Sequence, residues 1–407
     1  MKRLCYSLPP AGQKIPWMSM VRSVWEDWRG SHGDWLQAIQ NFLGAQNVFY
    51  LSSGRAALWL ILKAISQIQP EKSEVILPAY TCPAVASAIL KANLKPVLCD
   101  INPDNFGFKI ENLKPKMNKR TLGVILVHLF GYPANVLEVQ KICREHGLLM
   151  IEDAAQAFGN SLSNSPESKL GLLADAGFFS FGRGKPISLM HGGMLTTHSE
   201  EIFGEARKAH QDLNHRGSFR NLKYGLSLGS SSLFSNPYMY WIPQRIPSLH
   251  LGETIFEPDF IASSGVKLAG SLAGRMLGSL EGEKEVRQEN SEWYSSNLSD
   301  VPWVKPAPSG RFPYLRYPLL VKDEKMRDRL LDLLMSQGTG AALFYPCPLN
   351  ELQGLKGILQ DSSVYPNAKK LSESLITLPV HSGVTERIRN RIRSVVQQGT
   401  LPNFSTH

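Results

Sequence analysis

The sequence is organised around the segment Ile151-Glu-Asp-Ala-Ala-Gln-Ala-Phe158, which is followed, after an apolar run, by Ser180-Phe-Gly-Arg-Gly-Lys185. Asp153 ends one apolar run, where we expect a buried strand to stop. Lys185 follows a second apolar run and lies in a loop bounded by glycines. The two segments therefore place an acid and a lysine just beyond the ends of two predicted strands.

Strands and helices alternate on both sides of these segments. Short apolar runs predict strands, and longer runs with apolar residues at helical spacing predict helices. The predicted strands are Asn47–Leu51, Glu74–Pro78, Pro96–Asp100, Leu122–Val127, Leu148–Glu152 and Ala176–Phe181, and the predicted helices are Trp25–Leu43, Ala57–Ile65, Val85–Ala92 and Leu137–His146. This alternation implies right-handed crossovers and a mostly parallel, covered sheet, which is an α/β fold.

The carboxyl ends of the predicted strands meet at one rim of the sheet. Ligands of open α/β sheets bind beyond these ends. Three distant segments reach the rim in the predicted topology, namely Ser53-Gly54, Tyr80-Thr81-Cys82 and Asp153. The rim is therefore where we expect the functional site.

The chain changes character after the predicted sheet. Residues 207–254 are basic at first and then aromatic and broken by prolines, which indicates an insertion. A long helical pattern follows at Ala262–Leu298, and Tyr314–Val321 opens a smaller α/β part. We therefore predict a large domain at residues 1–255, and a long helix with a small C-terminal domain at residues 256–407.

The composition indicates a packed globular protein. Of the 407 residues 43% are hydrophobic and 19% are charged, which provides enough apolar surface to offset chain ordering. The net charge of +9 favours anionic partners, and charge alone does not separate nucleotide or sugar phosphates from nucleic acid or acidic lipid. No apolar run of about 18 residues predicts a transmembrane helix, and the first residues do not resemble a signal peptide.

The cysteines indicate neither a disulfide framework nor a zinc site, because their number is odd and no two of them form a CxxC pair. A reducing cytoplasm is the expected setting. We expect no metal site, since there is no HExxH motif and the histidines are dispersed. We interpret His128, His146 and His191 as structural. The cysteines are Cys5, Cys82, Cys99, Cys143 and Cys347.

Lys185 is the central candidate for chemistry. A single loop lysine is usually a solvated surface charge, but this one follows a buried run, and partial desolvation favours the neutral amine needed to form an imine. The Gly-Arg-Gly-Lys sequence is not a P-loop, because Pro186 stands where Ser or Thr belongs and Phe179 where the first glycine belongs. The sequence contains no GxSxG elbow, which is the motif that would indicate a serine hydrolase.

An acid and a lysine in this arrangement suit pyridoxal phosphate. Asp153 would pair with the pyridine nitrogen and keep the ring an electron sink, although a helix N-cap is an equally good interpretation of Asp153 alone. Gln156, one helical turn later, would approach the phenolic oxygen, or it would face solvent. The turn Ser53-Gly54-Arg55, with Ser180, would hold the phosphate at a helix N-terminus. No GxGxxG motif follows an early predicted strand, which argues against a dinucleotide-binding fold.

Taken in order, these motifs resemble those of the DegT/DnrJ/EryC1/StrS family of pyridoxal-phosphate-dependent sugar aminotransferases, and the likeness runs over most of the chain. The resemblance implies fold type I, the aspartate aminotransferase fold, with a large, mostly parallel sheet domain and a smaller C-terminal α/β domain. The motifs are Ser53–Leu58, Pro78–Pro83, Ile151–Gln156, Ser180 with Lys185 at the S-x4-K spacing, His191–Leu195, Phe344–Leu349 and Leu378–His381.

The resemblance implies a role for each site residue. Lys185 would bind the cofactor covalently and, once freed, move the proton between Cα and C4′. Asp153 would hold the pyridinium and Gln156 the phenolic oxygen. The phosphate would be held by Gly54, Arg55 and Ser180.

Three positions depart from the family pattern. The family commonly stacks an aromatic ring on the cofactor at the position of Cys82, for which Tyr80 is the candidate substitute. A phosphate-binding asparagine from the neighbouring subunit has no clear match near Asp259-Phe260. A histidine of the small domain is replaced by Phe344.

The insertion at 207–254 has two interpretations. It is a dimer-interface or lid segment, or it contacts a membrane surface through residues 233–250. The second interpretation depends on the composition of an interfacial anchor, which is given by Tyr238, Tyr240, Trp241 and Arg245.

We therefore expect a cytoplasmic homodimer with its active site at the subunit interface, peripheral at the inner membrane face if the insertion binds lipid. It would transfer an amino group from L-glutamate to a nucleotide-linked keto-sugar, for polysaccharide or glycoconjugate biosynthesis, and would bind no nucleic acid. The alternatives are a dehydratase, other carbon–nitrogen chemistry on a lipid-linked acceptor, and a non-catalytic interaction protein. Dehydratases of the family replace the lysine with histidine, so Lys185 favours transamination.

Overall fold

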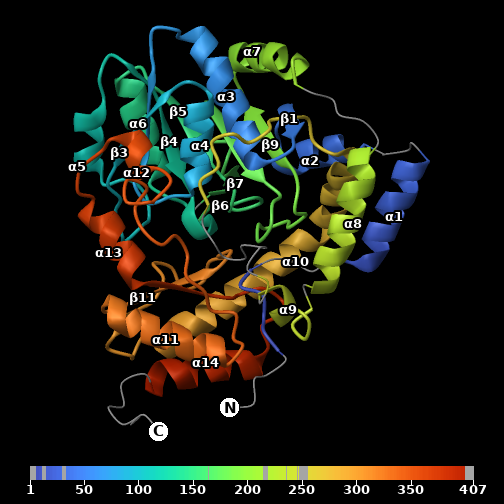
Figure 1. Cartoon of the computed structure of the whole chain (residues 1–407), viewed down its shortest axis with the longest axis vertical. Helices are drawn as coiled ribbons and strands as arrows, with labels where there is room; N and C mark the ends of the chain where they lie inside the picture. The colour runs from blue at the N-terminus through green and yellow to red at the C-terminus, as the bar shows by residue number, and fades with distance from the viewer. Residues whose placement is uncertain are drawn as a thin grey trace.

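The computed structural model describes residues 6–11, 15–29, 34–163, 165–213, 219–234, 236–244, 246 and 255–398. A seven-stranded sheet and a three-stranded sheet lie at opposite ends of the long helix α10 (Figure 1). The helices are α1 Trp17–Trp28, α2 Trp35–Leu43, α3 Gly54–Ile68, α4 Pro83–Lys91, α5 Ile110–Leu113, α6 Val136–Glu145, α7 Glu200–Gln211, α8 Phe219–Phe234, α9 Trp241–Gln244, α10 Lys267–Leu298, α11 Glu324–Ser336, α12 Lys356–Leu359, α13 Pro366–Ser374 and α14 Glu386–Gln398. The strands are β1 Asn47–Leu51, β2 Glu74–Pro78, β3 Lys95–Cys99, β4 Thr121–Val127, β5 Leu149–Asp153, β6 Ser161–Leu162, β7 Ser165–Lys169, β8 Ala176–Ser180, β9 Gly193–Thr197, β10 Val304–Lys305, β11 Tyr317–Val321 and β12 Leu375–Leu378.

The large sheet has the order β1-β9-β8-β5-β4-β2-β3. β9 pairs antiparallel with both of its neighbours, and the other pairs of the sheet are parallel. The expected mostly parallel sheet is therefore confirmed, with β9 as the one strand of this sheet that runs against the rest. The carboxyl ends of β1, β2, β4, β5 and β8 consequently lie at the same rim.

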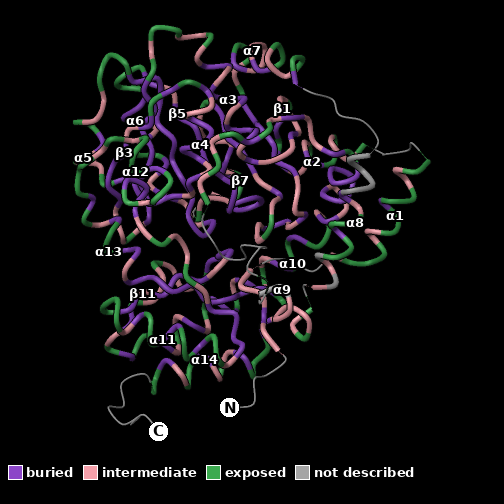
Figure 2. Tube along the Cα trace, in the orientation of Figure 1, coloured by how far each residue is buried: buried purple, intermediate pink, exposed green. Residues whose placement is uncertain are grey.

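Both faces of the large sheet are covered, as Figure 2 shows by the buried chain along its strands. Within β4 the side chains alternate between two clusters. Ile125 and Val127 join the cluster that contains α3 and α4, whereas Val124 and Leu126 join the cluster that contains α6. This alternation is why the strand carries an unbroken apolar run rather than a half-polar pattern.

The three-stranded sheet is antiparallel in the order β10-β11-β12. Asp100 directly follows β3 and connects the large sheet to α13, the helix that precedes β12. The Asp100 carboxylate accepts hydrogen bonds from the backbone N–H groups of Asn367 and Ala368, at 3.2 and 2.9 Å. These bonds satisfy the first N–H groups of α13.

The domain boundary near residue 255 stays a prediction. The long helix α10 begins 12 residues after it, at Lys267.

The helix expected at Trp25–Leu43 is two helices. α1 begins at Trp17, directly after Pro16, and α2 begins after Asp34, whose φ of −89° and ψ of 47° are not helical. Two helices, α8 and α9, lie within the predicted insertion at 207–254, although part of that segment, including Arg245, is outside the described residues. None of the described helices is long and apolar enough to span a bilayer.

Candidate active site

Three side chains predicted from separate segments meet at the rim. Lys185 follows β8, Asp153 ends β5, and Cys82 is the N-cap residue of α4. Burial lowers the pKa of Lys185, and the neighbouring Cys82 and Asp153 oppose that shift. Because desolvation outweighs these two groups, Lys185 carries a neutral amine at lower pH than an exposed lysine does.

Asp153 is the acid of this group and is 5% exposed. Burial raises the pKa of its carboxyl, while Lys185, the N–H of Ala155 and His128 oppose the shift. One carboxylate oxygen accepts the Ala155 N–H at 3.0 Å, which is the N-cap-like contact that the sequence left open. The same side chain therefore ends the strand and interacts electrostatically with Lys185.

Gln156 lies on the same loop and is buried. Its Oε1 accepts the N–H of Phe130 at 3.1 Å, and its Nε2 lies 3.5 Å from the hydroxyl of Tyr345. The interpretation of Gln156 as a solvent-facing residue is therefore wrong. Its amide is fixed by the backbone and presents its NH2 group to Tyr345.

Tyr345 was not predicted as a site residue, although it lies in the Phe344–Leu349 motif. Its phenol is affected by Cys82, Asp153 and Tyr80, and burial raises its pKa well above the usual range. Tyr80 fixes the Tyr345 backbone, because the Tyr80 hydroxyl donates to the Tyr345 carbonyl at 3.1 Å and accepts its N–H at 3.2 Å. The role of Tyr80 or Cys82 in stacking on a cofactor stays a prediction.

The predicted phosphate turn is at the start of α3. Ser53 caps this helix by accepting the N–H of Ala56 at 3.1 Å, and the first intrahelical bond runs from Ala57 N–H to Ser53 at 3.0 Å. The N–H groups of Gly54 and Arg55 therefore precede the helical hydrogen bonds and can bind an anion. A Cβ on Gly54 would lie 2.8 Å from Cβ of Ser180, so this approach requires glycine.

The Arg55 side chain has partners within the chain. Its guanidinium forms an ion pair with Glu257 at 2.7 Å and lies 4.7 Å from the ring centroid of Phe260. Of the predicted phosphate ligands, the structure thus brings together Ser53, Gly54 and Ser180, while the Arg55 side chain pairs with Glu257. A phosphate contact by Arg55 is most simply made by its backbone N–H.

These groups fit pyridoxal phosphate. A desolvated lysine, a buried acid beside it, an amide whose NH2 group faces Tyr345 and a helix N-terminus closed by glycine and serine supply the four kinds of contact that its aldehyde, ring nitrogen, phenolic oxygen and phosphate require. The assignment of each residue to its part of the cofactor remains an expectation.

The histidines expected to be structural have backbone and carboxylate partners. His128 is fully buried, with Nε2 2.8 Å from Glu152 and Nδ1 accepting the Ala134 N–H at 3.3 Å. His191 accepts the N–H of Val266 at 3.3 Å. Throughout the ranges that the structure describes, no group of His, Cys, Asp and Glu residues is arranged to hold a metal ion.

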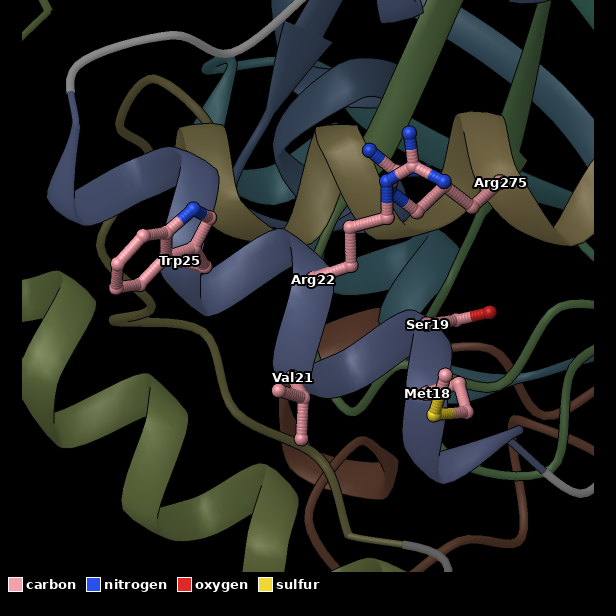
Figure 3. Close-up of a pocket in the computed structure, with 6 residues that line it drawn as sticks. All are labelled: Met18, Ser19, Val21, Arg22, Trp25 and Arg275. Atoms are coloured by element: carbon pink, nitrogen blue, oxygen red, sulfur yellow. The ribbon is translucent and has the colours of Figure 1, made fainter.

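A separate hollow lies between α1 and α10 and contains none of the predicted site residues (Figure 3). Side chains of α1, including Arg22 and Trp25, line it together with Arg275 of α10. Arg275 also binds Glu26 of α1. This hollow is part of the packing between the two helices rather than of the rim.

Comparison with known proteins agrees with the resemblance of the motifs. Residues 22–230 and 267–397 match the model of the DegT/DnrJ/EryC1/StrS aminotransferase family. The chain is 26% identical over 345 residues to dTDP-4-dehydro-2,3,6-trideoxy-D-glucose 4-aminotransferase of Saccharopolyspora spinosa, covering 84% of this chain and 81% of that protein. It is 24% identical over 371 residues to UDP-N-acetyl-3-dehydro-alpha-D-glucosamine 3-aminotransferase of Acidithiobacillus ferrooxidans, covering 91% and 89%.

Solved structures share the fold. Helicobacter pylori PseC, an aminotransferase involved in the biosynthesis of pseudoaminic acid, superimposes with a TM-score of 0.74 at 20% identity over 97% of this chain and 98% of its own. These matches confirm fold type I. Because the family model covers both the large sheet and the small domain, this chain belongs to the DegT/DnrJ/EryC1/StrS family and is a pyridoxal-phosphate-dependent aminotransferase.

Proposed function

We propose that the protein transfers an amino group from L-glutamate to a keto-sugar attached to a nucleotide, for the biosynthesis of a surface polysaccharide or related glycoconjugate. The observation that carries the proposal is the desolvated Lys185 amine beside the buried Asp153 carboxyl. The names of the two relatives given above describe aminotransferases of nucleotide-linked keto-sugars, which supports this class of acceptor. The net charge of +9 suits an anionic nucleotide.

Pyridoxal phosphate, when bound, supplies an electron sink for negative charge at the substrate Cα. Lys185 Nζ, whose pKa is lowered by burial, would provide the amine for covalent attachment and, when free, would accept the Cα proton. The Asp153 carboxylate favours a proton on the ring nitrogen. The Gln156 NH2 group, oriented by the Phe130 backbone, would be the donor for the phenolic oxygen.

Transamination is favoured over a dehydratase reaction because the position that family dehydratases fill with histidine is Lys185 here. A free lysine amine could carry the proton from the substrate Cα to C4′ of the cofactor, which is the proton transfer that each half-reaction of an amino transfer needs. Carbon–nitrogen chemistry on a lipid-linked acceptor is the remaining alternative for the acceptor.

The proposal is tested in two half-reactions. Protein loaded with pyridoxal phosphate is mixed with L-glutamate, and the formation of pyridoxamine phosphate and 2-oxoglutarate is measured by chromatography. The product protein is then mixed with 4-keto and 3-keto nucleotide sugars, and the aminated sugar is identified by mass spectrometry. Release of a deoxygenated sugar without a new amine would support the dehydratase instead.

We also propose that the protein is a homodimer with its active site at the subunit interface. The segment 255–263 runs beside the start of α3, since Ser52 donates its N–H to Ser263 at 2.9 Å. Ile255 and Ile261 of this segment are 46% and 63% exposed, which is unusual for large apolar residues next to a site and suits coverage by a second copy. Light scattering at micromolar concentration should give twice the chain mass of 45.3 kDa, and a monomer would contradict the proposal.

Contact with the inner face of a membrane through residues 233–250 is a further proposal. Tyr238 is 69% exposed and therefore accessible to a lipid surface, although its ring forms a T-shaped contact with the ring of Tyr6. Liposome flotation should recover less protein when 233–250 is deleted. Because α1 also exposes Trp17 and Trp28, the double variant Trp17→Ser/Trp28→Ser is the matched control. Equal flotation of the deletion variant and wild type would contradict a contact through 233–250.

A further inference from the structure

The loop that carries Lys185 also presents an exposed arginine, Arg183. Gly184 lies between the two residues and turns the chain with a φ of +69°. Arg183 forms no ion pair with any residue that the structure describes, whereas Arg311, an exposed arginine of the small domain, pairs with Glu292 at 2.9 Å. An uncompensated positive charge therefore lies two residues before the reactive amine.

The predicted insertion contains a compact turn directly before α9. The carbonyl of Asn236 accepts the N–H groups of Met239 and Tyr240, both at 2.8 Å. Nε1 of Trp241, the first residue of α9, donates to the carbonyl of Tyr238 at 2.9 Å. Three hydrogen bonds within six residues therefore fix the backbone of this turn.

The two tyrosines of the turn have different surroundings. Tyr238 is 69% exposed. Burial raises the pKa of the Tyr240 phenol, and the positive charges of Arg316, which directly precedes β11, and Arg183 oppose that shift. The Tyr240 phenol is therefore directed toward the lysine loop, and it keeps its proton near neutral pH and can donate a hydrogen bond.

The N-terminal segment 6–11 contacts both the turn and the lysine loop. The N–H of Ser7 donates to the carbonyl of Pro237 in the turn at 2.8 Å. At the other end of the segment, Cβ of Ala11 would lie 4.0 Å from a Cβ added to Gly184. One short segment thus places the turn of the insertion beside the loop of the same chain.

The small domain anchors this segment. Leu8 is buried, and its N–H donates to the carbonyl of Gly338 at 3.1 Å. Nε2 of His381 lies 2.9 Å from the carbonyl of Pro9 and is the donor in this hydrogen bond, because a carbonyl oxygen can only accept. The position of the turn is consequently set by backbone contacts on two sides.

We propose that Arg183 and Tyr240 bind the diphosphate of the nucleotide-linked acceptor. The inference rests on the proposed function. A sugar ring separates the reacting carbon from the phosphates, so groups that bind the phosphates must lie to one side of Lys185. Arg183 meets this condition, since two residues of chain span at most about 7 Å. Its guanidinium can bind two phosphate oxygens at once, and the Tyr240 hydroxyl can donate to a third.

The test measures the binding of UDP, dTDP and GDP to the protein loaded with pyridoxal phosphate, by isothermal titration calorimetry. At least one diphosphate should bind about 10-fold or more tightly than its nucleoside. Arg183→Gln should raise the Kd of that diphosphate about 10- to 100-fold, because charge-assisted contacts are lost, and Arg183→Lys should raise it less. Arg311→Gln is the matched control and should keep the wild-type Kd.

Tyr240→Phe should raise the same Kd about fivefold, the effect of one lost hydrogen bond, while Tyr238→Phe should leave it unchanged. Ser7→Pro removes the N–H that binds Pro237 and should act like Tyr240→Phe, whereas Ser7→Ala keeps this N–H and should behave as wild type. The glutamate half-reaction of Arg183→Gln should stay within about threefold of wild type, because glutamate carries no phosphate.

The outcomes separate this inference from the proposed function. A wild type that binds none of the three diphosphates more tightly than its nucleoside would overturn the inference, as would an unchanged Kd in Arg183→Gln. An equal loss of diphosphate binding and of the glutamate half-reaction would also overturn it, because it would show a general disturbance of the lysine loop. A wild type that binds a diphosphate through Arg183 but forms no 2-oxoglutarate from glutamate would support the diphosphate site and contradict the proposed function.

Discussion

Glu152 and Asp153 are neighbouring carboxylates at the end of β5, and they have opposite surroundings. Glu152 accepts the N–H groups of Gly171, Leu173 and Ala174 at 3.0, 2.6 and 3.0 Å, and it lies 2.8 Å from Nε2 of His128. Asp153 accepts one N–H at 3.0 Å and lies within the electrostatic influence of Lys185.

The difference follows from strand geometry. Successive side chains of a strand point to opposite faces, so Glu152 points to the face of Met150 and Asp153 to the face of Ile151. One carboxylate has its hydrogen-bonding capacity filled by the protein and stabilises a loop. The other retains capacity and lies next to a desolvated amine. Burial alone therefore does not identify the reactive acid, because both are buried.

The largest effect on turnover is expected at Lys185, whose amine lies on the Asp153 side of β5. Lys185→Ala removes both the covalent attachment and the proton acceptor, and turnover should fall by at least about 10³-fold. Stopped-flow absorbance of the glutamate half-reaction measures this loss. Lys169→Ala, at a lysine of β7 outside the site, is the control and should keep wild-type turnover. If the turnover of Lys185→Ala equalled that of wild type, a different amine would have to bind the cofactor and accept the proton.

Asp153→Asn should lower turnover by about 10²–10⁴-fold, because an amide cannot supply the negative charge opposite the ring nitrogen. The free energy of unfolding should change by less than about 1 kcal/mol, since Asn retains an acceptor for Ala155. Denaturant titration and steady-state kinetics on the same preparation measure the two quantities. A large loss of stability with little loss of rate would give Asp153 the role assigned to Glu152.

Glu152→Gln should show the reverse pattern. Its new NH2 group would face backbone donors and leave buried N–H groups unsatisfied, which should cost about 2–4 kcal/mol of unfolding free energy. The half-reaction rate of the folded fraction should remain within about threefold of wild type, well short of the losses typical of removing a catalytic acid or base. The comparison between the two carboxylates fails if this variant is as stable as wild type.

Gly54→Ala tests the phosphate end of the same rim. The added Cβ would approach Cβ of Ser180 to 2.8 Å, and the start of α3 would have to shift. We expect the Kd for pyridoxal phosphate, measured by fluorescence titration, to rise about 10-fold, which corresponds to about 1.4 kcal/mol. Gly278→Ala on α10, where an added Cβ meets nothing within 4 Å, should leave the Kd unchanged.

The smallest effect concerns the pH at which the amine reacts. The positive charge of Arg316 lowers the pKa of Lys185. Arg316→Gln removes that charge, so the protonated amine becomes less unfavourable and the pKa of Lys185 rises. The rate at which apo-protein binds pyridoxal phosphate covalently should therefore reach its half-maximum at higher pH. A shift to lower pH, or an equal shift in Arg311→Gln, would contradict this arrangement.

The sequence was sufficient for six of the seven strands of the large sheet and for the residues at their ends, whereas β9 was not predicted. The apolar run at Glu74–Pro78 has the bounds of β2, and the carboxyl ends of the predicted strands bring Asp153 and Cys82 to the same rim. The alternation along β5 also contains the contrast between Glu152 and Asp153, although recognising Glu152 required the loop at 171–174 that binds it. The break between α1 and α2 was missed, although Gly30 and Gly33 favour a helix end and Asp34 a helix start.

What the sequence could not provide were contacts between distant segments. Arg316 and Tyr345 reach the rim from the small domain, and no local spacing records that approach. Arg55 has a phosphate-binding position in its motif, but Glu257, 202 residues later, pairs with its side chain. Such partners are set by tertiary packing rather than by local pattern.

The most direct test of the account is reduction of the protein–cofactor complex with borohydride, followed by peptide mapping. The account predicts one phosphopyridoxyl group per chain, attached to Lys185, with the same site and yield in Glu152→Gln and none in Lys185→Ala. A label on a different lysine, or a protein that takes up no pyridoxal phosphate, would contradict it.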